Sequence, residues 1–302
     1  MRIFITGGTG FIGRTLTKAL VREGHDVTVL TRTPGAPSGT GRGLSFLAGD
    51  PLGQGEWQSA VADHDVVINL AGASIFGRWT KERRKAIRES RLLTTGRIVE
   101  ALSGDRGRVR RLLSASAVGF YGFCGDAELD EQGPPGEGFL ASLTRDWEAA
   151  ARDAEAFGVS VALLRFGVVL GRDGGALKQM IPPFRWYLGS PMGSGRQWFS
   201  WIHEKDLVEI FLFLLGRENI AGPLNCTAPH PVRNEEMTTT LGDVLGKPTF
   251  MPAVPGFVLR ILMGKFAETL LKGQRVLPGR LRDSGFGFRF PELNAALKDL
   301  LK

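Results

Sequence analysis

The sequence predicts an α/β protein: a doubly wound, Rossmann-type parallel sheet followed by a small, mostly helical C-terminal lobe. Short apolar runs rich in β-branched residues alternate with helical patterns across the first 171 residues, as successive βαβ units require. Beyond that point the chain becomes rich in Pro, Gly and aromatic residues, and the periodic segments that follow are helical. We therefore expect one domain over residues 1–171, to which later segments can return, and a second lobe over residues 172–302.

The start of the chain contains the most informative βαβ unit. An apolar run over Arg2–Thr6 suits a buried strand, helical spacing of apolar residues follows it, and a second β-branched run covers Asp26–Thr31. Between the first strand and the helix stand Gly7, Gly10 and Gly13. In a dinucleotide site the first glycine allows a sharp turn, the second lets a pyrophosphate approach the backbone, and the third lets the helix pack on the sheet. The alternative is a tight turn without a ligand, which the matching strands and helix disfavour.

The end of the second predicted strand indicates which dinucleotide would bind. NAD sites place a carboxylate there for the ribose 2′-hydroxyl, whereas NADP sites provide an arginine. Here the strand ends at Thr31 and Arg32, and no carboxylate stands between Asp26 and Asp50. The pattern predicts NADP(H) as the cofactor, and the alternative is a solvated arginine at the start of a loop.

The remaining elements of the first domain follow in order. After a Pro/Gly/Ser loop over residues 33–43, apolar runs predict four further strands: Leu44–Ala48, Asp65–Leu70, Arg111–Ala115 and Val159–Leu170. Helical patterns over Trp79–Leu102 and Phe139–Ala156 separate them. The strand that ends at Leu70 leads into Ala71 and Gly72, whose small side chains would let a cofactor cross the edge of the sheet.

The second lobe has a different character. It begins with a stretch over Lys178–Trp201 that follows no single period and is typical of a loop-rich segment. A helical pattern then runs to Leu215, and three later segments are also predicted as helices: Asn234–Leu245, Phe257–Leu271 and Glu292–Leu301.

Charge, hydropathy and cysteine content exclude several classes of protein. The net charge of +7 comes largely from Arg78–Arg111, where acidic and basic residues interleave as on a solvated helix, so we expect no nucleic-acid partner. The longest apolar run, Ile210–Leu215, is far too short to span a bilayer, so we expect no membrane partner. Cys124 and Cys226 have no metal-ligand neighbours at suitable spacing, which predicts no metal site and suits a reducing cytoplasm. The first residues already belong to the first strand, so we expect no signal peptide.

Motifs along nearly the whole chain can now be combined. They are the glycine turn over residues 7–13, the Asn69–Gly72 turn, Ser114–Ser116, Leu164–Gly171 and Gly193–His203. Together they resemble the epimerase family of atypical short-chain dehydrogenase/reductases, the sugar-nucleotide-epimerase-like group. The tail, from Gln274 to Leu297, resembles that group's short C-terminal domain of unknown function, which would begin at about residue 250.

The resemblance implies an NADP-binding Rossmann domain with contacts that can be carried over by position. Matching positions are Thr9, Gly10, Phe11 and Ile12 for the phosphates, Thr31 and Arg32 for the 2′-phosphate, and Ala71 and Gly72 for the adenosine half. Arg91 on the long helix, Ser114 after the fifth strand and Arg165 in the sixth strand are further cofactor candidates.

The catalytic residues of the superfamily are missing. Its working epimerases and dehydratases use a Tyr and a Lys four residues later, and the Lys lowers the Tyr pKa for proton exchange while hydride moves to the nicotinamide. With Glu148 as the anchor of the helix, these positions fall near Leu140 and Thr144, and no Tyr or Lys occurs between Gly122 and Val159. The resemblance to epimerases therefore concerns the fold, and a fold does not establish a function.

Other residues are candidates for catalysis and for substrate binding. Ser116 and Tyr121, just past the fifth strand, could orient or protonate a carbonyl, although Tyr121 also suits packing beneath its loop. We place the substrate site between residues 114–121 and the aromatic and basic stretch 185–203, because ligands lie beyond the carboxyl ends of the strands. Its candidate residues are Arg185, Arg196, Trp198 and His203. His203 would serve equally well as the cap of the helix that follows it.

The sequence therefore predicts an NADP(H)-dependent oxidoreductase or isomerase that acts on a small, anionic substrate held by the second lobe. The alternative is a sensor or scaffold that binds NADP(H) without turnover, which the absent dyad permits. A nucleic-acid or partner-binding role that exploits the positive charge is the least favoured, and the sequence predicts no oligomeric state.

Overall fold

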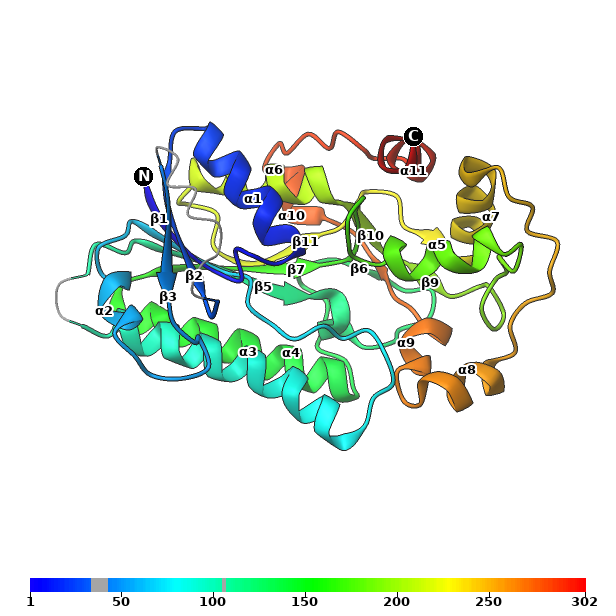
Figure 1. The fold of residues 1–302 in the computed structure, drawn as a ribbon, viewed down its shortest axis with the longest axis horizontal. Helices are drawn as coiled ribbons and strands as arrows, with labels where there is room; N and C mark the ends of the chain where they lie inside the picture. Colours follow the sequence, from blue (N-terminus) through cyan, green and yellow to red (C-terminus); the bar gives the residue numbers. More distant parts are fainter. Residues whose placement is uncertain (34–42, 105–106) are drawn as a thin grey trace.

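The computed structural model describes residues 1–33, 43–104 and 107–302, so the loop predicted over residues 33–43 lies almost entirely outside the described part. Parallel strands form a central sheet of seven in the order β11-β7-β5-β4-β1-β2-β3 (Figure 1). Their bounds are β1 (Arg2–Thr6), β2 (Asp26–Thr31), β3 (Leu44–Ala48), β4 (Val66–Asn69), β5 (Arg111–Ala117), β7 (Ser160–Phe166) and β11 (Gly222–Cys226). The direction of winding reverses between β1 and β4, so the predicted fold class is confirmed.

Two features of the sheet differ from the sequence prediction. The single strand predicted over Val159–Leu170 is two strands, because β8 (Val168–Leu170) leaves the sheet after Gly167 and pairs with β10 (Trp201–His203). A Cβ on Gly167 would lie 2.7 Å from the Ser200 carbonyl oxygen, so the crossing requires glycine. The edge strand β11 comes from beyond residue 171 and pairs with β7. Its sequence, which contains a proline and no alternation, did not predict a strand.

Helices cover both faces of the sheet, as Figure 1 shows. One face carries α1 (Phe11–Arg22), α6 (Glu204–Leu215) and α10 (Gly279–Asp283). The other carries α2 (Trp57–Val61), α3 (Lys81–Leu102) and α4 (Phe139–Arg152). A 3₁₀ turn over Val118–Tyr121 follows β5, and a second one, over Asp153–Phe157, follows α4. The helix predicted from Trp79 begins at Lys81, because the Thr80 side chain accepts a hydrogen bond from the Arg83 backbone N–H and caps it.

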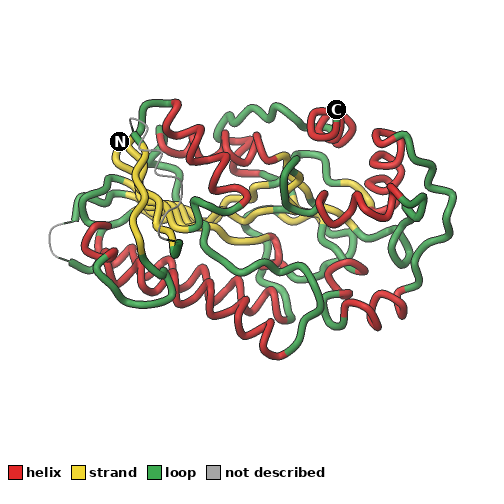
Figure 2. The backbone as a smooth tube through the Cα atoms, in the orientation of Figure 1, coloured by secondary structure: helices red, strands yellow, loops and turns green. Residues whose placement is uncertain are grey.

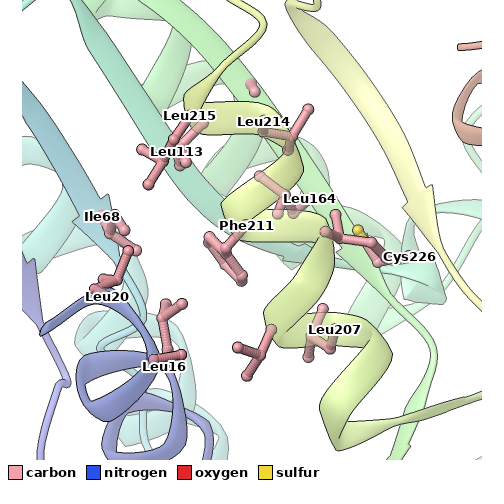
Figure 3. Packing of buried hydrophobic residues seen from close by; sticks show 14 of the residues in the cluster. Leu16, Leu20, Ile68, Leu113, Leu164, Leu207, Phe211, Leu214, Leu215 and Cys226 are labelled. Carbon is pink, nitrogen blue, oxygen red and sulfur yellow. The ribbon is translucent and has the colours of Figure 1, made fainter. Parts of the chain in front are cut away.

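The core on the α1 and α6 face is one continuous apolar cluster (Figure 3). Leu16 and Leu20, one turn apart on α1, and Phe211 of α6 meet Ile68 and Leu164 of the sheet, and all are fully buried. This packing holds the N-terminal end of α1 against the carboxyl ends of β1 and β4.

The C-terminal lobe consists of short helices and strand pairs (Figure 2). Its helices are α5 (Leu177–Arg185), α7 (Asn234–Leu245), α8 (Gly256–Met263), α9 (Ala267–Leu271) and α11 (Leu293–Leu301), and its strand pairs are β9 (Trp198–Phe199) with β12 (Val232–Arg233) and β13 (Arg275–Val276) with β6 (Glu128–Leu129). The helix predicted over Phe257–Leu271 is two helices, and α5 lies within the segment expected to be loop. Two prolines lie within α5, and because proline disfavours a helix interior the sequence did not predict a helix there. Burial of Leu177 and Phe184 stabilises the helix. No helix in the described part of the chain is long and apolar enough to cross a bilayer.

Candidate functional site

The turn between β1 and α1 brings the backbone closer than any side chain would allow. Gly7 has a φ of +73°, and a Cβ on it would lie 2.7 Å from the Leu70 carbonyl carbon at the end of β4. A Cβ on Gly13 would lie 2.2 Å from the Gly7 carbonyl oxygen. Strand, turn and helix can therefore pack in this way only with glycine at these two positions. The turn lies at the point where the winding of the sheet reverses, between β1 and β4.

The N-terminal end of α1 is open to an anion. Gly10 is its N-cap and offers no side-chain hydrogen bond, and no acidic residue stands in the first turn. Thr9 and Gly10 are exposed, whereas Phe11 and Ile12 are half-buried. Uncapped backbone N–H groups at a helix N-terminus carry a partial positive charge and bind phosphates. The residues predicted to contact the phosphates, Thr9, Gly10, Phe11 and Ile12, thus lie together at this helix end, and Gly7 and Gly13 shape the turn that holds them.

The Phe11 side chain has a packing partner of its own. A Cβ on Gly171 or Gly174 would lie 2.2 Å or 2.5 Å from atoms of the Phe11 ring, so the turn after β8 wraps that ring. The backbone of Phe11 remains part of the open helix end. Its ring packs against the turn after β8 and so holds the first turn of α1 beside that turn. The sequence motif alone did not indicate this second function.

The end of β2 places Thr31 and Arg32 beside this helix end. Thr31 is buried, and its hydroxyl accepts a hydrogen bond from the Thr33 backbone N–H at 3.3 Å. Arg32 is exposed at the carboxyl edge of the sheet. A cation at this edge is well placed for an anionic group attached to a ribose.

The turn after β4 carries an unusual cation. A Cβ on Gly72 would lie 3.2 Å from the Arg91 guanidinium carbon, and Arg91 donates to the carbonyl oxygens of Ala73 and Ile87 at 3.1 Å and 3.0 Å. Burial lowers the pKa of Arg91 to about 10, and no carboxylate pairs with it within the described part of the chain. Gly72 therefore lies directly against the Arg91 guanidinium, so the turn after β4 carries a positive charge.

Three polar residues that were not predicted as site residues hold the turn after β4 in place. Asn69 at the end of β4 accepts from the Thr6 hydroxyl at 2.7 Å and donates to the Thr95 hydroxyl at 2.9 Å. All three side chains are buried, so the bonds tie the ends of β1 and β4 to α3. A buried amide between two apolar strands was the available signal, since such a group must find partners.

The residues predicted for catalysis lie in a buried polar network. Ser116 donates to Glu148 Oε1 at 2.5 Å, and Arg165 donates to both oxygens of Glu148 at 2.8 Å. Arg165 also donates to the Tyr121 hydroxyl at 2.9 Å, and that hydroxyl donates to Asn225 at 2.7 Å. Burial raises the pKa of Tyr121 to about 12. The structure thus brings Ser116, Tyr121 and Arg165 together, but it commits their hydrogen-bonding groups to one another.

Ser114 and the dyad positions lie beside this network. Ser114 is fully buried in β5. A Cβ on Gly119 would lie 3.2 Å from Leu140 Cβ and 3.8 Å from the Thr144 hydroxyl, so both dyad positions face the turn after β5. Leu140 packs in an apolar cluster with Trp79 and Phe266. The Thr144 hydroxyl donates to the Leu140 carbonyl oxygen at 2.7 Å, which leaves neither position with a group that exchanges protons.

The residues predicted for substrate binding are not gathered in one place. Arg185 and Arg196 are exposed, but Arg185 ends α5, which packs against α7, whereas Arg196 precedes β9. Trp198 is half-buried, and its Nε1 donates to Asp126 at 2.9 Å. The guanidinium of Arg233 lies 3.9 Å from the centroid of the Trp198 ring. The other large aromatic of the stretch, Trp201, is fully buried in the core of the lobe.

His203 caps a helix. Its Nδ1 accepts from the Lys205 backbone N–H at 3.0 Å, and its ring stacks on Phe290 with the centroids 3.9 Å apart. The side chain is fully buried, and burial lowers the pKa of His203 to about 4. Of the two interpretations that the sequence left open, the capping role fits these contacts. Among the described residues no cluster of His, Cys, Asp or Glu side chains is suited to hold a metal ion.

Comparisons with known proteins agree with this geometry. Residues 3–226 match the model of the NAD dependent epimerase/dehydratase family, and residues 254–300 match a domain of unknown function, DUF1731. The chain is 41% identical over 304 residues to a chloroplastic Arabidopsis thaliana homologue of the epimerase family protein SDR39U1, which covers 100% of the chain and 87% of the relative. It is 37% identical over 303 residues to the epimerase family protein YfhF of Bacillus subtilis, with 100% and 98% covered. The crystal structure of human epimerase family protein SDR39U1 (isoform2) with NADPH superimposes with a TM-score of 0.86 at 37% identity, with 99% of each chain covered.

Proposed function

The chain belongs to the NAD dependent epimerase/dehydratase family, and we propose that it binds NADPH and acts as an oxidoreductase or isomerase on a small anionic substrate. The observation that carries the cofactor proposal is the exposed Arg32, at a strand end that lacks a carboxylate, beside the open N-terminus of α1. The human relative crystallised with NADPH supports it, at 37% identity over nearly the whole chain.

Each part of this candidate site has a proposed role in holding the cofactor. The backbone N–H groups over residues 9–12 bind the pyrophosphate, and Arg32 with Thr31 binds the 2′-phosphate. Ala71 and Gly72 contact the adenosine half, and the cation of Arg91 stabilises the nearby phosphate charge. Once bound, the nicotinamide supplies hydride transfer, while the chain supplies orientation and electrostatics.

The proposal for the substrate rests on the approach of β9 to the turn after β5. Gln274 donates to the Val118 carbonyl oxygen at 3.0 Å, and its own carbonyl oxygen accepts from the Ser200 hydroxyl at 2.8 Å. These bonds link Ser200, next to β9, to Val118 in the turn after β5, which supports a substrate site between that turn and the segment that contains Arg196 and Trp198. We therefore assign the anionic group of the substrate to Arg196 and an apolar contact to Trp198, rather than to Arg185 or His203.

The alternative function is an NADPH-binding sensor or scaffold without turnover. The dyad positions Leu140 and Thr144 favour it, because Leu140 is apolar and the Thr144 hydroxyl donates to the Leu140 carbonyl oxygen, so neither supplies a group that exchanges protons. A cytoplasmic location is also part of the proposal and is supported by the bacterial relatives, whereas the plant relative is chloroplastic by name.

Turnover assays distinguish the two functions. An enzyme oxidises NADPH, seen as falling nicotinamide absorbance, with at least one member of a panel of small anionic carbonyl compounds, whereas a sensor binds NADPH and oxidises none. UDP-glucose and related sugar nucleotides should not be epimerised at rates typical of the superfamily, because no Tyr–Lys dyad is present. Rapid conversion of a sugar nucleotide, measured by chromatography, would contradict the assignment of the dyad positions.

A further inference from the structure

Exposed apolar side chains are concentrated on one part of the C-terminal lobe. Outside this part, the large hydrophobic side chains that the described residues expose are Met1, Leu93, Phe123 and Phe157. Within it they are Trp186, Tyr187 and Leu188 after α5, Phe250 after α7, and Phe257, Ile261 and Leu262 on α8. Trp186 is 78% exposed and Phe250 is 73% exposed. Single exposed apolar side chains are common on protein surfaces, whereas a concentration of them marks an interaction site. We call the residues of this set the apolar face.

Two segments contribute the apolar face, and direct contacts place them together. The Lys247 ammonium lies 4.0 Å from the centroid of the Tyr187 ring, which joins the end of α5 to the segment after α7. A parallel β-bridge between Met192 and Val254 joins the same two segments just before α8. In Figure 1 the chain between α7 and α8 runs along the outer edge of the lobe, away from the sheet.

The charges of these two segments are all positive. No Asp or Glu occurs between Gly174 and His203, or between Val244 and Ala267. Within those limits stand six basic residues: Lys178, Arg185, Arg196, Lys247, Arg260 and Lys265. Acidic residues resume only at their borders, at Asp173, Glu204, Asp243 and Glu268. The two segments that contribute the apolar face therefore carry cations and no anions of their own.

Helix α8 presents this combination on its exposed side. Phe257 and Ile261 are one turn apart, Leu262 adjoins them, and the three are 61–66% exposed, while Leu259 on the opposite side is buried. Arg260 and Lys265 are exposed beside them. Short helices with aromatic and aliphatic tips among Lys and Arg lie in the interface of anionic bilayers, and Trp and Tyr are enriched at that depth.

We propose that the apolar face binds the surface of an anionic lipid bilayer, with Phe257, Ile261 and Leu262 of α8 inserted and Arg260 and Lys265 at the headgroups. The expectation of no membrane partner rested on the lack of a spanning segment, and a peripheral contact needs none. A second copy of the chain fits less well, because a twofold interface would bring the cations of both copies together. An acidic protein would neutralise the positive charges, but charge neutralisation does not explain why so many aromatic and aliphatic side chains are exposed.

Vesicle sedimentation of the whole protein tests the proposal. The parent protein should bind vesicles made of equal parts of phosphatidylcholine and phosphatidylglycerol, bind phosphatidylcholine vesicles weakly, and lose binding as salt is raised. The triple variant Phe257→Ser, Ile261→Ser, Leu262→Ser should bind the anionic vesicles at least about tenfold more weakly. The matched control, Leu93→Ser with Phe157→Ser, also removes exposed apolar groups, but from the sheet domain, and should bind as the parent does.

Thermal unfolding shows first whether each variant is folded. If the triple variant does not fold, the single variant Ile261→Ser is tested in its place. Equal binding of parent and variant to anionic vesicles would overturn the proposal, as would absence of binding by the parent. Light scattering that shows a dimer in the parent and a monomer in the variant, without vesicle binding, would assign the apolar face to a second copy. Binding of poly-glutamate in place of vesicles would assign it to an acidic protein.

Discussion

At the scale of the residue, the partners of each cation decide what it can do. Arg165 is 3% exposed and forms two bonds with the Glu148 carboxylate, so its charge is neutralised inside the protein. Arg91 has carbonyl partners only, and its lowered pKa records the cost of burial without a carboxylate. Arg32 is exposed at the edge of the sheet. Of these three cations, Arg32 and Arg91 therefore have charge available for a bound anion. Arg165 is bonded to Glu148 and has a structural role.

Substitution of Arg32 tests the assignment of the 2′-phosphate. Arg32→Ala should weaken NADPH binding about 10- to 100-fold, because a hydrogen bond to a charged group contributes roughly 1.5–3 kcal/mol. Binding of NADH, which lacks the phosphate, should hardly change. Fluorescence titration of both nucleotides measures the effect, and Arg22→Ala, at the exposed far end of α1, is the matched control. Equal losses for both nucleotides would refute the assignment.

The buried His203 predicts a stability that depends on pH. Its pKa is about 4 in the folded protein and near 6.5 when unfolded, so the unfolded state gains the proton first as the pH falls. Stability should fall between about pH 7 and pH 4, by at most about 3 kcal/mol. Asp299, Lys205 and Arg289 are the charged groups nearby, and burial opposes the attraction of Asp299. Urea unfolding at several pH values should show a smaller fall for His203→Asn, which keeps a capping acceptor; parallel curves would exclude His203 as the cause.

At the scale of the element, close backbone approach determines which glycines matter. A Cβ on Gly13 would lie 2.2 Å from the Gly7 carbonyl oxygen, within the turn between β1 and α1. Gly96 lies in α3 with no atom within 4 Å of its missing Cβ. Both glycines lie within helices, so the helical pattern does not tell them apart. Only the atoms that surround each helix show which glycine is required.

The two glycines should respond in opposite ways to alanine. Gly13→Ala should destabilise the protein by about 2 kcal/mol or more and abolish NADPH binding, because α1 must move away from the strand. Gly96→Ala should stabilise it by about 0.5–1 kcal/mol, since alanine favours the helix and meets nothing. Urea unfolding and nucleotide titration measure both. A neutral Gly13→Ala would mean that the helix end adjusts without cost.

At the scale of the whole molecule, buried polar groups fasten the C-terminal segment to the sheet. Asn225 of β11 accepts from Tyr121 and donates to the Leu277 carbonyl oxygen at 2.9 Å. Glu131 accepts from the backbone N–H groups of Asn225 and Arg280. Asp206 at the start of α6 accepts from the N–H groups of residues 289 and 290. The lobe and the sheet domain are therefore joined by directed bonds as well as by apolar packing.

Removal of the amide of Asn225 should loosen this junction. Asn225→Leu removes the acceptor of the Tyr121 hydroxyl proton and the amide that donates to the Leu277 carbonyl oxygen, and we expect a loss of about 2–4 kcal/mol. Limited proteolysis should then cut the segment after residue 250 faster than in the parent. Asn294→Leu, exposed on α11, is the control and should change neither measurement. Unchanged proteolysis with lowered stability would show that the junction opens only on global unfolding.

The sequence by itself determined the features that depend on local pattern. The strands at Arg2–Thr6, Asp26–Thr31 and Leu44–Ala48 lie where the apolar runs predicted them, and the fold class follows from the alternation of strands and helices and from the glycine turn. The family was indicated by a resemblance carried by motifs along nearly the whole chain, and it is confirmed. The helix over Asn234–Leu245 also has its predicted bounds. In each case the signal is the spacing of residues a few positions apart, which the backbone geometry of strands and helices converts directly into structure.

Only the tertiary structure decided which polar groups are free and which are committed. Tyr121 and Asn225 are 104 residues apart, and Ser116 and Glu148 are 32 apart, so no local pattern could pair them. The return of β11 to the sheet, the division of β7 from β8 at Gly167 and the wrapping of Phe11 by Gly171 are decided in the same way. The physical reason is that burial and hydrogen-bond satisfaction depend on which distant segments are in contact, and the sequence pattern of either segment alone does not contain that information.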